Sequence, residues 1–142
     1  MLIPTIIVLS IIGALISAYL TWIELITVVG TCPLSGFLSC SKVLFGPYSK
    51  FFGIPVAFGG LVWFLVAMAL ASGIKKRGNW MLALLVVWSG IGLAGVLVLF
   101  FVEAFLVDEI CLYCTSAHAI GLAVIGLTFL IWSRRQRTAF AR

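Results

Sequence analysis

Hydrophobic residues fill four stretches of the chain that are each long enough to cross a lipid bilayer. A spanning helix needs about 20 consecutive, mainly apolar residues. The pattern predicts such helices over residues 1–23, 51–74, 78–102 and 110–133. The first stretch lacks the basic start and the cleavage site of a secretory signal, so we expect it to be retained. The sequence therefore predicts an all-α membrane protein, a bundle of four transmembrane helices.

Composition supports this interpretation. Of 142 residues, 64% are hydrophobic and 9% are charged, which leaves too few polar residues to cover a water-soluble globule. The length suits a single domain over residues 1–142. The net charge of +5 comes mostly from two short basic clusters beside apolar stretches, which is typical of membrane topology and gives no indication of nucleic-acid binding.

The basic clusters predict how the chain crosses the membrane. One cluster separates the second and third stretches and the other follows the fourth; they contain Lys75, Lys76 and Arg77, and Arg134, Arg135, Arg137 and Arg142. Because Lys and Arg are enriched in cytoplasmic loops, we expect both termini in the cytoplasm. The 32–50 loop and the 103–110 turn then face outward, where disulfides persist. All four cysteines lie at that outer face: Cys32, Cys40, Cys111 and Cys114.

Small residues spaced four apart let membrane helices approach closely, and three such pairs predict a compact bundle. They are Gly13 and Ser17, Gly90 and Ala94, and Ala117 and Gly121. We expect Trp63 and Trp88 to be packing residues. Glu24, near the outer end of the first helix, is expected at the membrane interface, although an inward-facing carboxylate in lipid is usually functional.

The Cys-x-x-Cys pair formed by Cys111 and Cys114 stands at the predicted start of the fourth helix. Cysteines spaced i, i+3 there share one face, and the helix N-terminus favours a thiolate, an effect that the nearby Asp108 and Glu109 oppose. Cys114 lies about 4.5 Å further along the helix axis, nearer the apolar interior. His118 follows one turn deeper on the same face.

The loop over residues 30–55 contains the second cysteine pair, Cys32 and Cys40. Pro33 and Gly36 between them allow the chain to turn back, so that the two sulfurs can pair. Long connections in compact domains are often functional. The aromatic residues of the loop favour a segment that lies on the bilayer interface and caps the bundle.

Three interpretations of the four cysteines compete. Two static disulfides are possible, but a Cys-x-x-Cys ring closes too short a loop to stabilise the fold much. A tetrathiolate metal site fits the spacing without being characteristic of it, and an oxidising environment disfavours it. A thiol-disulfide electron relay uses the placement of both pairs, and we favour it. Its natural two-electron carrier in a membrane is a quinone, which His118 could hydrogen-bond or protonate.

The loop pair ending in C-S-K-V-L, the segment F-G-I-P and the motif C-L-Y-C together resemble the vitamin K epoxide reductase (VKOR) family, especially its prokaryotic homologues. The resemblance implies a four-helix bundle around a quinone such as ubiquinone or menaquinone, with an extracytoplasmic loop or short helix as a cap. It implies that Cys32 exchanges with a thioredoxin-fold partner, Cys40 with Cys111, and that Cys114 reacts with the quinone. The chain has no room for a fused thioredoxin-like domain, so the partner is expected to be separate. We expect His118 and Phe58 to contact the quinone, and no metal.

Two positions depart from the family pattern. Gly46 stands where members often have serine, and His118 stands where vertebrate enzymes have tyrosine. We therefore expect quinone-linked disulfide formation, with reduction of vitamin K quinone or epoxide as the alternative. A non-enzymatic scaffold with structural disulfides is the second alternative.

Overall fold

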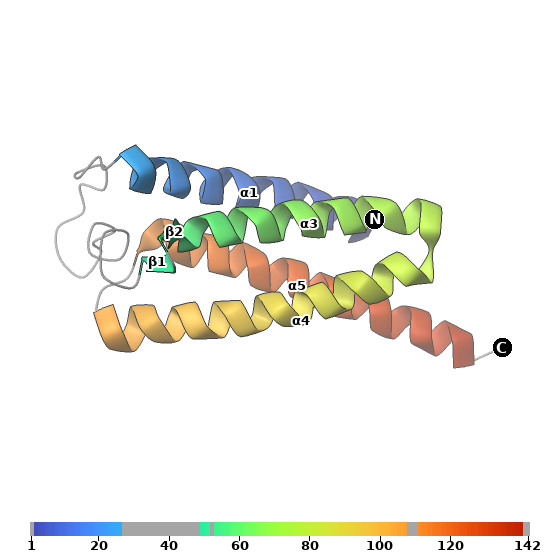
Figure 1. Ribbon diagram of the computed structural model, residues 1–142. Helices are drawn as coiled ribbons and strands as arrows, with labels where there is room; N and C mark the ends of the chain where they lie inside the picture. Colours follow the sequence, from blue (N-terminus) through green and yellow to red (C-terminus); the bar gives the residue numbers. More distant parts are fainter. Residues whose placement is uncertain (1, 27–48, 52, 108–110, 141–142) are drawn as a thin grey trace.

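The computed structural model describes residues 2–26, 49–51, 53–107 and 111–140 (Figure 1). Its four long helices are α1 (Leu2–Ile26), α3 (Val56–Arg77), α4 (Asn79–Phe101) and α5 (Leu112–Phe140). A π-helical segment, η1 (Val102–Val107), continues α4, and a short hairpin of β1 (Lys50–Phe51) and β2 (Ile54–Pro55) precedes α3. The four helices are long and apolar enough to cross a membrane. The predicted four-helix membrane bundle is confirmed.

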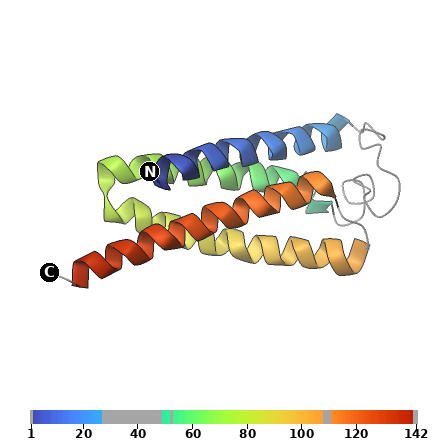
Figure 2. The same ribbon diagram turned by 180° about the vertical axis from the view of Figure 1, so that it is seen from behind.

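The helices form a four-membered ring in cross-section. Helix α1 packs mainly along α3 and α5, and α4 packs along the same two helices, so α1 and α4 are diagonal partners. The start of α1, the α3–α4 turn and the end of α5 lie at one end of the bundle, and the start of α5 lies at the other (Figures 1 and 2). The basic clusters therefore share one end, as the topology prediction requires, while the side of the membrane that this end faces stays a prediction.

The two ends of the bundle are packed differently. A continuous apolar core fills the half that contains the α3–α4 turn; it includes Ile6, Ala67, Ala71, Ile74, Leu82, Leu85, Val124 and Ile131. Towards the other end the buried cluster shrinks to Leu20 and Cys111 with a few partly buried neighbours. Large apolar side chains such as Leu97, Phe100 and Phe105 are exposed on the outside, as expected for surfaces that face lipid.

Three element boundaries differ from the sequence prediction by five residues or more. Helix α3 begins at Val56 rather than at residue 51, because β1 and β2 pair as a hairpin whose turn contains Gly53 at φ 82°, a conformation that favours glycine. The expected outward turn at 103–110 is wrong over its first half, since η1 continues the third helix to Val107. Helix α5 runs to Phe140, because the arginines after Ser133 are good helix formers.

A single glycine makes the turn between α3 and α4. Gly78 has φ 61°, and its N–H donates to the carbonyl oxygen of Ile74 at 3.0 Å. The positive φ of Gly78 ends α3 and lets α4 begin at the next residue. A residue with a Cβ would be strained in this conformation, whereas glycine is not. The two helices are thereby held as a tight antiparallel pair.

Close helix contacts occur at glycines that the four-residue spacing identified only in part. A Cβ added to Gly13 would lie 2.4 Å from the Phe64 ring, so α1 and α3 approach closely where predicted. Gly90 is exposed and has nothing within 4 Å of such a Cβ, so its predicted packing role is wrong. The close approach occurs at Gly92 instead, where an added Cβ would clash with the Trp63 ring, because two residues correspond to about 200° around a helix.

Candidate functional site

The Cys-x-x-Cys pair lies at the N-terminus of α5. Cys111 directly precedes the helix and Cys114 lies in its first turn. Their Sγ atoms are 2.7 Å apart, and the Cys114 N–H points at Cys111 Sγ at 3.3 Å. The sulfur separation exceeds the roughly 2.05 Å of a disulfide bond. A small movement therefore suffices to form that bond.

The two sulfurs have different surroundings. Cys111 is fully buried and packs beside Leu20 of α1. Cys114 is partly exposed and lines a cavity between the helices. This difference agrees with the sequence-based expectation that Cys114 is the sulfur nearer the interior site.

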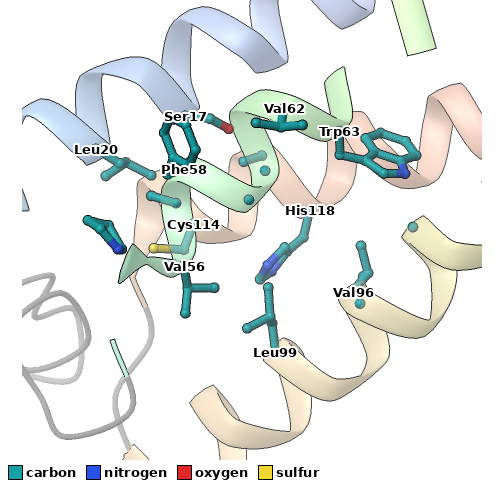
Figure 3. Close-up of a pocket in the computed structure, with 18 of the residues that line it drawn as sticks. Ser17, Leu20, Val56, Phe58, Val62, Trp63, Val96, Leu99, Cys114 and His118 are labelled. Carbon is teal, nitrogen blue, oxygen red and sulfur yellow. The ribbon is translucent and has the colours of Figure 1, made fainter. Parts of the chain in front are cut away.

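The cavity has a volume of about 880 Å³ and is lined by all four long helices. Figure 3 shows the apolar side chains that form much of its wall, among them Val56, Val96 and Leu99. The volume is within the usual range of small-molecule sites, about 300–1,000 Å³. A mainly apolar site with a few polar groups suits a hydrophobic ligand with a polar ring.

His118 and Phe58, the two expected quinone contacts, both line this cavity. His118 projects from α5, one turn from Cys114, towards Leu99 of α4. The Phe58 side chain points away from His118 (Figure 3). The Nδ1 atom of His118 is buried and has no hydrogen-bond partner among the described residues. Phe58 is 44% exposed. The two side chains therefore serve different parts of one cavity.

Glu103 is a site residue that the sequence analysis missed, because it assigned this position to an outward turn. The residue lies in η1, is 5% exposed and lines the cavity. Its Oε1 accepts a hydrogen bond from the Cys111 N–H at 2.5 Å, and the Thr115 hydroxyl also hydrogen-bonds the carboxylate. Its Oε2 lies 3.9 Å from His118 Nδ1. The only sequence signal was a carboxylate at the end of an apolar stretch, eight residues before Cys111.

Glu24 also lines the cavity, which favours the inward-facing carboxylate over the interfacial one that we expected. It is 3% exposed, and its carboxylate hydrogen-bonds Ser49. The spacing of residues along α1 explains this. Ser17 lies four residues after Gly13 and Glu24 lies seven residues after Ser17, so all three share the buried face of the helix. Extending the small-residue stripe by two turns would have identified it.

Trp63 and Trp88 belong both to the apolar core and to the cavity wall. Both pack against the apolar core, as predicted, and both also line the cavity.

Cys32 and Cys40, with the expected cap and Gly46, lie outside the described residues. Their assignments stay predictions.

A comparison with protein families adds an independent finding. The model of the vitamin K epoxide reductase family matches residues 4–129, a range that includes every cysteine, most of α1 and α5, and all of α3 and α4. Members of this family are oxidoreductases that act with quinones. The chain therefore belongs to the vitamin K epoxide reductase family and is a multi-pass membrane oxidoreductase.

Proposed function

We propose that this protein is a quinone-dependent thiol-disulfide oxidoreductase that oxidises a separate, extracytoplasmic thioredoxin-fold protein and so supports disulfide bond formation. One observation carries the proposal. Cys114 lines an apolar cavity, and its sulfur is 2.7 Å from the Cys111 sulfur. A dithiol and a lipid-soluble electron acceptor can thus meet at one sulfur.

The cavity suits a quinone. Its apolar wall matches the ring substituents and the start of an isoprenoid tail, and the His118 imidazole in that wall can donate a hydrogen bond to a quinone oxygen. Cys114 and His118 would hold the ring in this arrangement, and Phe58 would contact another part of the ligand. A bound quinone supplies a two-electron, two-proton acceptor that leaves as quinol.

The proposed electron path has three exchanges of two electrons each. The partner dithiol reduces the Cys32–Cys40 disulfide through a mixed disulfide and is itself oxidised. The loop dithiol then reduces the Cys111–Cys114 disulfide, with Cys40 attacking Cys111. Cys114 finally gives the electron pair to the acceptor as the bond to Cys111 forms again, and the two thiol protons complete the balance.

The burial of Cys111 adds a requirement to this path. Its sulfur is fully buried beside Leu20, whereas exchange needs in-line access by an attacking thiolate. The start of α5 must therefore open for Cys40 to reach Cys111. Cys114, which faces the cavity, needs no such opening towards the acceptor.

The test uses purified protein in detergent with a short-chain quinone and a reduced thioredoxin-fold protein. Quinol is expected to form, and Cys114→Ala is expected to abolish it. Cys32→Ser, which removes the thiol that resolves the mixed disulfide, should accumulate a Cys40–Cys111 crosslink with Cys114 released as the thiolate, detected by mass spectrometry. Quinol formation by Cys114→Ala at the wild-type rate would refute the role of that sulfur. A variant with all four cysteines changed to serine separates an enzyme from a scaffold, since a scaffold would lose only stability.

A further inference from the structure

Glu103 connects the Cys-x-x-Cys pair to the imidazole that faces the cavity. Through Oε1 the carboxylate accepts the hydrogen bond of the Cys111 N–H at 2.5 Å. Its other oxygen, Oε2, lies 3.9 Å from His118 Nδ1. The residues that it faces on α5, Cys111, Thr115 and His118, are spaced four and three apart and so share one face of that helix.

A purely structural role does not explain this position. Capping the start of α5 needs only one oxygen, yet both oxygens of Glu103 face α5 in a residue that is 5% exposed. A buried carboxyl group is costly in an apolar environment, and such groups within membrane spans are usually functional. The π-helical form of η1 adds a second indication. Such turns are rare in proteins as a whole, and those that occur are often at functional sites.

The unpartnered nitrogen of His118 is what Glu103 can serve. Nδ1 is buried without a hydrogen-bond partner among the described residues. A separation of 3.9 Å from Oε2 is too long for a hydrogen bond, but rotation of either side chain or one water molecule closes it. With Oε1 already accepting from Cys111, a proton on Oε2 can be passed to Nδ1 of His118.

We propose that Glu103 is a proton-exchanging positioning residue that acts through His118, an inference that rests on the proposed function. Protonated Glu103 gives its Oε2 proton to His118 Nδ1 while His118 gives its Nε2 proton to the oxygen of the reduced ligand. The imidazole stays neutral and changes tautomer. Oxidation of the Cys111–Cys114 dithiol releases two protons; one restores Glu103 and the other reaches the second ligand oxygen through water.

Other titratable groups near this path are few in the part of the chain that the structure describes. Helix α5 contributes Cys111, Cys114 and His118, and α1 contributes Glu24, which lines the same cavity and lies near Lys50 of β1. The stretch of α3 that lines the cavity contributes none. Glu24 is therefore the matched comparison for Glu103, as a second carboxyl group that lines the cavity but lies on a different helix.

The decisive variant is Glu103→Gln, because an amide keeps the oxygen that accepts from the Cys111 N–H but cannot transfer a proton. Quinol formation from pre-reduced protein is expected to fall about 100-fold, in line with general acid-base catalysis, and to lose one limb of its pH profile. The melting temperature and the rate at which dithiothreitol reduces the Cys111–Cys114 disulfide should not change. Glu103→Asp should restore the limb in part, and Glu24→Gln should keep it.

A double variant tests whether the two residues act in one path. Glu103→Gln combined with His118→Gln is expected to be no slower than His118→Gln alone. Additive losses, or wild-type rate and pH profile in Glu103→Gln, would overturn the inference. So would equal slowing of disulfide reduction and quinol formation, because that pattern marks a cap alone. Absence of quinol formation by the wild-type protein refutes the proposed function and this inference together. A Glu103→Gln variant with the wild-type rate and pH profile refutes only the inference.

Discussion

Trp63 and Trp88 join α3 to α4 by a reciprocal pair of hydrogen bonds. The Trp63 indole N–H donates to the backbone carbonyl oxygen of Trp88 at 3.1 Å, and the Trp88 indole N–H donates to that of Trp63 at 3.0 Å. Both side chains also line the cavity. The same pair therefore stabilises the helix contact and shapes the cavity wall.

Replacing Trp88 by Phe should destabilise the bundle by about 1 kcal/mol, since hydrogen bonds between membrane helices contribute about 0.6 kcal/mol on average and up to about 1.7. Thermal unfolding in detergent measures the change. Trp80→Phe is the matched control, because Trp80 is 67% exposed. Equal losses for the two variants would show that the reciprocal bonds add nothing.

Gly92→Ala should destabilise the protein by about 1–3 kcal/mol, the usual cost of overpacking, and should weaken quinone binding. The added methyl group would lie 2.3 Å from the Trp63 ring, which must then move within the cavity wall. Gly90→Ala adds the same atom to the same helix where nothing lies within 4 Å, and is expected to be neutral or stabilising by up to about 1 kcal/mol. The two melting temperatures and a quinone titration decide; the reverse order would contradict the packing described above.

An apolar maleimide should modify Cys114 faster than Cys111. The experiment uses reduced protein with Cys32→Ser and Cys40→Ser, so that only the α5 pair reacts. Cys114 is partly exposed in the cavity, while Cys111 is fully buried, and thiol reactivity depends on exposure. Peptide mass spectrometry measures both sites over time, and added quinone should protect Cys114. Faster labelling of Cys111 would reverse the assignment of the two sulfurs.

The orientation in the membrane has a direct test. In a cysteine-free background, Lys76→Cys places a thiol on an exposed residue of the end that we expect in the cytoplasm. A membrane-impermeant label should reach it only after permeabilisation, and should reach a cysteine restored at position 32 in intact cells. Labelling of position 32 only after permeabilisation would exclude exchange with an extracytoplasmic partner.

Much of the fold could be predicted from the chain alone. Apolar stretches of spanning length determine four helices, because unpaired backbone groups are too costly in lipid to allow another structure. The placement of Cys114 and His118 in one cavity also followed from local periodicity, since residues four apart on a helix share a face. These predictions depend on interactions within one helix or on hydropathy, which sequence patterns record directly.

The partners across helices could not be predicted in the same way. Glu103 was assigned to a turn because no pattern in the sequence reveals that α4 continues as a π-helix, and its contact with α5 depends on how two separate helices are rotated. The choice of Gly92 over Gly90 is also a matter of rotation, fixed only when Trp63 of α3 packs against α4. Glu24 was misplaced although its phase along α1 was readable.

Sequence by itself thus determined the membrane-spanning helices, the gathering of basic residues at one end of the bundle and the cysteine pair at the start of α5. Each of these depends on local composition and helical period. Only the tertiary structure decided that Gly92 rather than Gly90 packs against Trp63, and that Glu103 lies between Cys111 and His118. Such relationships arise from the packing of four helices against one another, and the free energy of that packing is spread over contacts between residues distant in the chain.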